Sequence, residues 1–554
     1  MSTATAGSSE DVAPRYSVPA SPAGRIADPR PISRLFPLGY KEGFSQWWAS
    51  IPAATAEHKI LSFLPYLQQP PTHKQTGKDA ITPNESTDSL TAADPTQASQ
   101  VSATSIDDPH GPRVWRSTMV ELSGKNRALN EFSVERVGEQ TEQNLVILHG
   151  YGAGLGFFYK NFEPLSRPKG WQLYALDLLG MGRSTRPPFK IHAKERQEAI
   201  TEAEDWFVDA LEEWRVKRKI ERFTLMGHSL GGYMAVAYAL KYPGRLNKLI
   251  LASPVGIPED PYAVSAEMPE PSDSTMANEF TQDQNDVTKP AGDNNNLFNA
   301  RKNAEAAANN NPNNNGNNSQ PPRRPLPKWL KYLWDSNVSP FSLVRWSGPL
   351  GPRLVSGWTS RRFSHLPPAE AQALHDYAYS VFRMRGSGEY ALAYILAPGA
   401  FARSPLIRRI HGVGRQYITP TGPLGTGPTS TTPTPSAPVS SSSSVASAND
   451  NNTNISTPSP QREPGIPIVL MYGEQDWMDV TGGHAAVARI EEEKKRILEH
   501  ASEEERAADR GSAKVVIIRN AGHHLYLDGW EEFNGVVLDE MREVANMDGA
   551  GSRL

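Results

Sequence analysis

The sequence predicts an α/β fold with a mostly parallel central sheet flanked by helices. Short apolar runs recur along the chain, each ends in Gly, Asp or Pro, and helix-like stretches lie between several of them. Strands that are apolar throughout and alternate with helices are typical of parallel sheets covered on both faces. In such sheets the ligand site lies at the carboxyl ends of the strands. The expected strands are 145–150, 171–177, 222–227, 248–254, 466–473 and 514–522, and the expected helices include 199–217 and 231–242.

Polar tracts interrupt this pattern. Their composition cannot bury enough apolar surface to offset chain entropy, so we expect one large folded domain with disordered insertions. From the N-terminus the expected segments are a disordered tail (1–30), a Trp-rich amphipathic segment (31–67), a polar linker (68–112), the first part of the core (113–260), an Asn-rich disordered insert (261–325), a helical insertion (326–415), a Ser/Thr/Pro-rich disordered insert (416–463) and the second part of the core (464–545).

Composition excludes several classes of protein. The 554 residues include no Cys, which excludes a disulfide framework, a thiolate metal site and a Cys nucleophile. The net charge of -4 argues against a general nucleic-acid binder. No window reaches about 18 uninterrupted apolar residues, so we expect no transmembrane helix.

The Trp-rich segment allows two interpretations. Phe44, Trp47, Trp48 and Ile51 have the spacing of one face of a short helix that ends before Pro52. This helix either packs on the main domain or lies in a membrane interface with Trp47 and Trp48 at headgroup depth. The N-terminus also allows two interpretations. Its Arg and Ser residues suit a mitochondrial transit peptide, whereas its acidic residues favour a plain disordered tail.

The strongest chemical signal is Gly-His-Ser-Leu-Gly-Gly at 227–232. It follows a predicted strand and opens a predicted helix, which is the context of a nucleophile elbow that exposes the hydroxyl of Ser229. A Ser nucleophile needs a base, and the base needs an orienting acid. Asp476 and His523 both follow later strands, in the chain order that this fold requires. We predict Ser229, His523 and Asp476 as a triad, with Asp479 as the alternative acid or, otherwise, a helix cap.

Two further motifs accompany the triad. The Gly-rich segment 149–154 follows an early strand, and we predict the backbone N–H groups of Tyr151 and Leu230 as the oxyanion hole. A phosphate loop is the alternative for this segment, but it lacks the required spacing. His523 and Asp528 also form H-x4-D, a pattern resembling one used by glycerolipid acyltransferases, although Asp528 could simply begin the final helix. Acyl transfer to an alcohol therefore stays open beside hydrolysis.

These motifs together resemble one lipid-acting branch of the α/β-hydrolases. The segments HGYGAGLGFFYKNF, LDLLGMGRSTRPPF, GHSLGGYMA, YGEQDWMD and AGHHLYLDGWEEFN carry the resemblance. The branch includes mitochondrial cardiolipin-specific deacylases, N-acylphosphatidylethanolamine lipases, proteins described as lysophosphatidate acyltransferases, and a lipid-droplet coactivator of triglyceride lipase. The resemblance implies an α/β-hydrolase fold, Ser229 as nucleophile, His523 as base and a phospholipid substrate. Some members carry Asp only at the position of Asp479.

The resemblance also implies that 326–415 is a helical lid and that 31–67 docks on lipid. The lid carries Trp329 and Trp334 at helix-face spacing and a surplus of Lys and Arg. It is either an ordinary amphipathic cap with a solvated basic face or a surface that admits acyl chains and attracts anionic headgroups. We therefore name Trp47, Trp48, Trp329 and Trp334 as expected lipid-binding residues.

The sequence thus predicts a peripheral-membrane serine acyl hydrolase of glycerophospholipids, with cardiolipin or a related anionic or N-acylated phospholipid as substrate. We expect no metal, no organic cofactor and no nucleic-acid partner. The first alternative is a lysophosphatidate acyltransferase that uses acyl-CoA, and the second is a lipid-surface coactivator of another lipase. The coactivator has Asn in place of the elbow Ser, whereas this chain keeps Ser229. The expected location is the mitochondrial inner membrane, with cytoplasm or lipid-droplet surface as alternatives.

Overall fold

The computed structural model describes residues 37–67, 69–72, 100–259, 339–397, 401–418 and 461–551. The expected tail (1–30) and Asn-rich insert (261–325) lie outside these ranges, as do Trp329 and Trp334. Most of the expected linker and of the Ser/Thr/Pro-rich insert also lie outside them.

A nine-stranded sheet forms the centre of the described part, in the order β1-β2-β3-β5-β4-β6-β7-β10-β11. The first three strands pair antiparallel, as do β3 and β5, and the remaining pairs are parallel. The six strands expected from the apolar runs are confirmed. The strands are β1 (Gln100–Thr104), β2 (Arg113–Glu121), β3 (Ala128–Arg136), β4 (Gln143–Leu148), β5 (Trp171–Leu176), β6 (Phe223–His228), β7 (Leu246–Ala252), β10 (Pro467–Gly473) and β11 (Ser512–Ile518).

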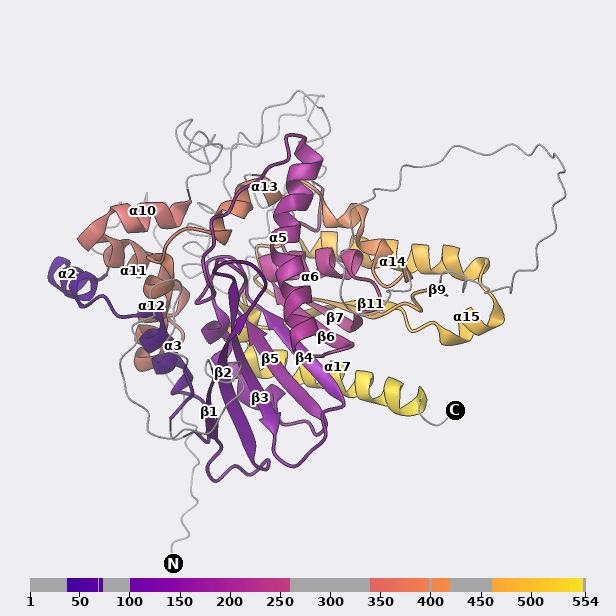
Figure 1. The fold of residues 1–554 in the computed structure, drawn as a ribbon, viewed down its shortest axis with the longest axis horizontal. Helices are drawn as coiled ribbons and strands as arrows, with labels where there is room; N and C mark the ends of the chain where they lie inside the picture. The colour runs from indigo at the N-terminus through magenta and orange to yellow at the C-terminus, as the bar shows by residue number, and fades with distance from the viewer. Residues whose placement is uncertain are drawn as a thin grey trace, which may run out of the picture.

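Helices cover both faces of this sheet. In Figure 1, α5 and α6 lie in front of the strands and α17 passes behind them, where it packs on α4. The apolar strands β4, β6, β7 and β10 are consequently buried almost throughout. The core helices are α4 (Tyr159–Leu165), α5 (Arg196–Lys217), α6 (Leu230–Lys241), α14 (Val480–Glu499), α15 (Glu503–Ala508), α16 (Leu525–Asp528) and α17 (Trp530–Gly551), with a 3₁₀ turn η2 (Leu155–Phe158).

Two expectations about the antiparallel strands β1, β2 and β3 were wrong or incomplete. Residues 100–104 form β1 inside the expected polar linker, and β2 and β3 were not among the expected strands. Charged residues interrupt the apolar pattern of β2 and β3, and partners on other elements help to bury them. Arg113 pairs with Glu163, and Glu131 accepts from Trp214 Nε1 at 2.8 Å.

The N-terminal segment and the first part of the expected lid (339–382) lie side by side at the left of Figure 1, far from α14 and α15. Helix α2 (Tyr40–Ala49) contacts α11 and the 3₁₀ turn η3, while α3 (Ala53–Leu61) packs against α12. The two helices differ, because α3 buries Ile60 and Leu61 completely whereas α2 buries only Gly43. The remaining elements are α10 (Pro340–Trp346), η3 (Gly348–Leu350), α11 (Gly351–Arg362), α12 (Pro368–Phe382), η4 (Gly388–Ala391), α13 (Leu392–Ile395), η5 (Leu406–Arg408) and η6 (Ile410–Gly412).

The ends of the expected Ser/Thr/Pro-rich insert also depart from prediction. Residues Tyr417–Ile418 (β8) and Gln461–Arg462 (β9) pair antiparallel and form a second, two-stranded sheet. No helix in the described ranges is long and apolar enough to cross a membrane. The carboxyl ends of β4, β6, β7 and β10 meet at one edge of the large sheet, and the predicted site residues follow those ends.

Candidate active site

Ser229 occupies a sharp turn between β6 and α6. Its φ of 51° and ψ of −115° place a non-glycine residue in a left-handed conformation, as expected of a nucleophile elbow. Close backbone approach explains the flanking glycines. A Cβ at Gly227 would lie 2.3 Å from the carbonyl oxygen of Gly231, and a Cβ at Gly231 would lie 2.6 Å from that of His149. Only glycine fits at either position, so the motif is required by local geometry.

Asp476 and His523 meet at the ends of β10 and β11. His523 Nδ1 lies 3.2 Å from Asp476 Oδ1, and both side chains are buried. Asp476 also accepts from the backbone N–H of Met478 at 3.0 Å and from the hydroxyl of Ser253. Burial alone would raise the pKa of Asp476, but these hydrogen bonds and the neighbouring His523 lower it. Asp476 is thus an ionised acceptor that orients the imidazole.

Asp479, the alternative acid, caps a helix. It is the N-cap of α14, where its Oδ1 accepts from the backbone N–H of Thr481 at 3.0 Å. Burial raises its pKa, in contrast to that of Asp476. Of the two candidate acids, Asp476 is the one that contacts His523.

His228 connects the elbow to the loop of the predicted base. Its Nε2 lies 3.0 Å from the carbonyl oxygen of His523, so Nε2 carries the proton and donates it. The rings of His228 and His523 lie 4.8 Å apart between centroids. Burial lowers the pKa of His228 well below its ordinary value, which keeps it neutral. The residue before Ser229 therefore holds the backbone of His523 in place.

The predicted oxyanion loop is oriented by His149. The backbone N–H of Leu178 donates to His149 Nε2 at 3.0 Å, so Nδ1 carries the proton and donates to the carbonyl of Gly150 at 2.7 Å. In a trans peptide the N–H opposes the C=O, so the Tyr151 N–H is directed away from His149. A Cβ at Gly150 would lie 3.1 Å from that of Ser229, which places this peptide directly against the elbow.

Asp177, which the sequence analysis missed, accepts hydrogen bonds from the backbone near the same loop. Its Oδ1 accepts from the backbone N–H of Leu155 at 2.7 Å, and its Oδ2 accepts from that of Arg183 at 2.7 Å. Asn130 Nδ2 bridges Asp177 and Glu57 of α3, at 2.8 and 3.2 Å. Helix α3 of the N-terminal segment is therefore connected, through Asn130, to the carboxylate that binds the backbone beside the predicted oxyanion loop.

The two residues of the H-x4-D pattern contact different partners. His523 contacts Asp476, whereas Asp528 forms an ion pair with Arg362 of α11, with Nη2 2.9 Å from Oδ1. Arg362 also donates through Nε to His524 Nδ1 at 2.7 Å. Asp528 ends the short helix α16, so it does not begin the final helix either.

Ser253 and Arg362 are further contributors that the sequence analysis missed. Ser253 directly follows β7, and a polar residue at the carboxyl end of a parallel strand is a candidate site residue that the sequence could have indicated. No local sequence pattern indicates Arg362.

The expected lipid-binding tryptophans of α2 differ in exposure. Trp48 is 74% exposed and Trp47 is half-buried. Trp346 at the end of α10 is 70% exposed and extends the exposed aromatic surface onto the lid. In the described part of the chain no cluster of three His, Asp or Glu residues has the arrangement of a metal site.

Comparisons with known proteins identify the family that the chain resembles. A family model described as alpha/beta hydrolase fold matches residues 143–349. An Arabidopsis thaliana protein named 1-acylglycerol-3-phosphate O-acyltransferase is 33% identical over 308 residues, which cover 54% of this chain and 58% of that protein. A Sus scrofa protein named 1-acylglycerol-3-phosphate O-acyltransferase ABHD5 is 31% identical over 54% of this chain and 67% of its own length. A human protein named (lyso)-N-acylphosphatidylethanolamine lipase is 25% identical over 74% of this chain and 83% of its own length.

Proposed function

Because this chain belongs to the α/β-hydrolase fold family, in the lipid-acting branch of these relatives, we propose that it is a serine acyl hydrolase of glycerophospholipids that works at a membrane surface. The observation that carries the proposal is the contact of His523 with Asp476, since an orienting acid is what a His base needs to activate a Ser hydroxyl. The strained Ser229 directly follows His228, which donates to the His523 carbonyl.

The proposed reaction has two halves. Ser229 Oγ attacks the carbonyl carbon of an acyl ester while His523 Nε2 takes the hydroxyl proton, and the N–H groups of Tyr151 and Leu230 stabilise the oxyanion. The ester C–O bond then breaks, and His523 returns the proton to the departing lysolipid. Water attacks the acyl-Ser229 ester with His523 as base again, which releases the fatty acid and restores the hydroxyl.

Cardiolipin, or a related anionic or N-acylated phospholipid, is the proposed substrate. The name of the human lipase relative supports a phospholipid with an N-acylated headgroup. Arg383 in the expected lid supports an anionic one, because it contacts only neutral oxygens in the described ranges and a basic residue near an anionic bilayer contributes about 1 kcal/mol to attraction. The mitochondrial inner membrane, where the protein would be peripheral, is the proposed location.

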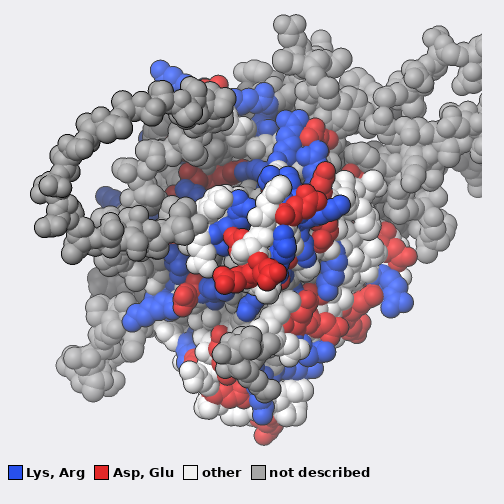
Figure 2. Space-filling model, turned by 90° about the vertical axis from the view of Figure 1, so that its right-hand side faces the viewer, with Lys and Arg blue, Asp and Glu red and all other residues white. Residues whose placement is uncertain are grey.

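The distribution of exposed apolar residues supports the membrane surface. We define the aromatic face as the exposed large apolar side chains of α2, α10, η3 and α11, which are Tyr40, Phe44, Trp48, Leu343, Trp346, Leu350 and Leu354. Such a cluster is unusual on a soluble face and suits an interface. The opposite end of the molecule differs, because Figure 2 shows Lys and Arg intermixed with Asp and Glu on its described part.

Mass spectrometry of mixed phospholipid vesicles tests the proposal. The protein and Ser229→Ala are incubated with vesicles that contain cardiolipin, phosphatidylethanolamine and N-acylphosphatidylethanolamine. We expect a monolyso product and free fatty acid that disappear in Ser229→Ala, with most product from the preferred headgroup. Release that is equal in both proteins would contradict the proposal. Vesicle binding without any Ser229-dependent product would favour a lipid-surface coactivator instead.

Acylation of lysophosphatidate is a second candidate, favoured by the names of the Arabidopsis and pig relatives. In this reaction the Ser229 acyl group comes from acyl-CoA, and the free hydroxyl of lysophosphatidate attacks in place of water, with His523 taking its proton. The same experiment with acyl-CoA and lysophosphatidate separates the two. Phosphatidate formed only with acyl-CoA and only with Ser229 intact would select the transferase.

A further inference from the structure

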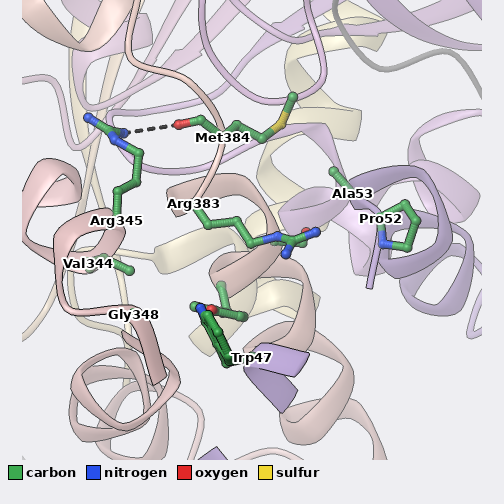
Figure 3. Close-up of a pocket in the computed structure, with 10 residues that line it drawn as sticks. Trp47, Pro52, Ala53, Val344, Arg345, Gly348, Arg383 and Met384 are labelled. Atoms are coloured by element: carbon green, nitrogen blue, oxygen red, sulfur yellow. Dashed lines mark hydrogen bonds between the residues drawn. The ribbon is translucent and has the colours of Figure 1, made fainter. Parts of the chain in front are cut away.

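A pocket of about 450 Å³ lies between α2, α10 and the C-terminal end of α12, away from the proposed catalytic residues. Figure 3 shows it with Trp47 at one side, Pro52 and Ala53 at another, and the Arg383 side chain extending between them. Its volume lies in the range of pockets that hold small ligands. It is thus large enough for part of a lipid molecule.

Positive charge distinguishes the pocket. Its lining includes Arg345 and Arg383 but no Asp or Glu. Arg345 is neutralised by Glu389 at 2.6 Å and donates to the carbonyl of Met384 at 3.0 Å (Figure 3). Arg383 contacts only neutral oxygens in the described ranges, among them the Ile51 carbonyl at 3.2 Å. Its charge is therefore available to an anion.

The aromatic face lies on the same helices as this pocket. Trp47 and Val344 line it, and the exposed Trp48 and Trp346 are their neighbours in sequence on α2 and α10. Trp side chains favour the headgroup level of a bilayer, where phosphate groups also lie. An aromatic face in the interface would therefore bring lipid phosphates to the depth of Arg383.

The helices that line the pocket also contact the proposed oxyanion loop. Phe341 lies one turn before the lining residue Val344 on α10, Phe382 directly precedes the lining residue Arg383, and the two Phe rings lie 4.5 Å apart. Phe341 stacks on Tyr151 at 5.1 Å, and a Cβ at Gly152 would lie 2.9 Å from Phe341 Cζ. A pair of Phe rings on the helices of the pocket thus contacts the residue that we propose as an oxyanion donor.

We propose that this pocket binds the phosphate headgroup of an anionic glycerophospholipid in the bilayer, at a subsite distinct from the ester cleaved by Ser229. The inference rests on the membrane-surface part of the proposed function. The Arg383 guanidinium binds the phosphate oxygens, since Arg offers several N–H donors and remains charged. The lipid held there stays in the membrane and anchors the lid beside the catalytic loop.

Gly348 offers a matched test because a Cβ there would meet open space. Its φ of +52° is a conformation that Asn and Asp tolerate better than other residues. Gly348→Asn and Gly348→Asp therefore differ by one negative charge in the pocket. In a Ser229→Ala background, which prevents turnover, both variants are titrated with phosphatidylcholine vesicles that contain or lack phosphatidate. We expect Gly348→Asp to bind phosphatidate vesicles about five-fold more weakly than Gly348→Asn, and phosphatidylcholine vesicles equally.

A second pair of variants checks the guanidinium itself. Arg383→Gln removes the pocket charge, whereas Arg385→Gln removes an exposed charge two residues away that does not line the pocket. We expect Arg383→Gln alone to weaken phosphatidate binding by about five-fold. Inorganic phosphate and sn-glycerol 3-phosphate are added as competitors at constant ionic strength, and we expect neither to remove the difference.

Three results would overturn the inference. They are equal binding by the two Gly348 variants, equal losses for Arg383→Gln and Arg385→Gln, and loss of the difference with inorganic phosphate, which would mean that free phosphate occupies the pocket. These results leave the proposed function standing if acyl release by the parent protein still requires Ser229. Failure of that requirement would reject the proposed function whatever the vesicles show.

Discussion

Arg362 of the lid holds both sides of the residue that we propose as catalytic base. Its Nη2 lies 2.9 and 3.0 Å from the two carboxylate oxygens of Asp528, and its Nε donates to His524 at 2.7 Å. Asp528 in turn accepts from the backbone N–H of Gly522 at 3.1 Å. Because Gly522 and His524 flank His523, a displacement of α11 must disturb the base.

Breaking this ion pair should therefore destabilise the protein. Arg362 and Asp528 are both largely buried, so Arg362→Met takes the guanidinium away from a buried carboxylate, which keeps its contact with His365 Nε2 at 3.4 Å. The loss should lower the free energy of unfolding by about 3 kcal/mol. Adding Asp528→Asn should recover part of this loss. Urea denaturation of the two single variants and the double variant measures the coupling. Strictly additive effects would show that the pair contributes nothing.

Substitution of the two candidate acids should affect kcat very differently. Asp476→Asn removes the ionised partner of His523 and should reduce kcat by about 10⁴, the effect of the corresponding change in trypsin-type triads. Asp479→Asn should leave kcat within a few-fold, since Asn is an equally good N-cap. Steady-state hydrolysis of a soluble ester by both variants measures this. A larger loss in Asp479→Asn would return Asp479 to the role of acid.

Gly150→Ala should impair the oxyanion loop. The new Cβ would lie 2.8 Å from His228 Nδ1, so the peptide that carries the Tyr151 N–H must shift. We expect kcat to fall by about 10², the range for loss of one oxyanion donor, with a smaller change in KM. Gly535→Ala is the control, because a Cβ at that helical position meets no atom within 4 Å. Unchanged kcat in Gly150→Ala would remove the Tyr151 N–H from the proposed site.

Stability should depend on the protonation of Glu57. Burial raises its pKa from 4.5 to about 7, with Arg183 opposing and Asp177 adding to the shift. The folded protein therefore binds a proton that the unfolded chain has released, and stability falls as pH rises from about 4.5 through about 7. The free energy of unfolding should drop by up to about 3 kcal/mol across this window.

Denaturation of the protein and of Glu57→Gln at a series of pH values checks this slope. We expect a flatter profile for Glu57→Gln in the window between pH 4.5 and 7. Parallel profiles would mean that Glu57 does not titrate there.

The aromatic face should govern attachment to vesicles. Trp48→Ala and Trp346→Ala each remove a largely exposed ring and should weaken binding by several-fold, since each buried aromatic contributes apolar area at the interface. Tyr417→Ala, at the exposed β8, is the matched control. Sedimentation with phosphatidylcholine–phosphatidate vesicles measures the difference. Equal binding by all three variants would place the attachment surface elsewhere.

Local sequence patterns were sufficient to predict the parallel strands of the sheet and the positions of the candidate catalytic residues after those strands. Apolar strands and the glycines around Ser229 follow rules of local periodicity and backbone clearance, which neighbouring residues express. For the same reason the residue pattern alone placed Asp476 and His523 at strand ends. The antiparallel strands β2 and β3 escaped prediction, because Arg113 and Glu131 interrupt their apolar pattern, and the partners that bury them include Glu163 and Trp214, which lie far away in the chain.

Long-range packing, in contrast, distinguished between alternatives that look equal in the sequence. Asp476 and Asp479 lie three residues apart, and the packing of β10 beside β11 brings one to His523 while the other caps α14. The contacts of Arg362 with Asp528 and of Asn130 with Glu57 likewise join residues with no local signal of their partnership. Hydrogen bonds and ion pairs of this kind depend on distances between separate elements, and those distances exist only once the chain has folded.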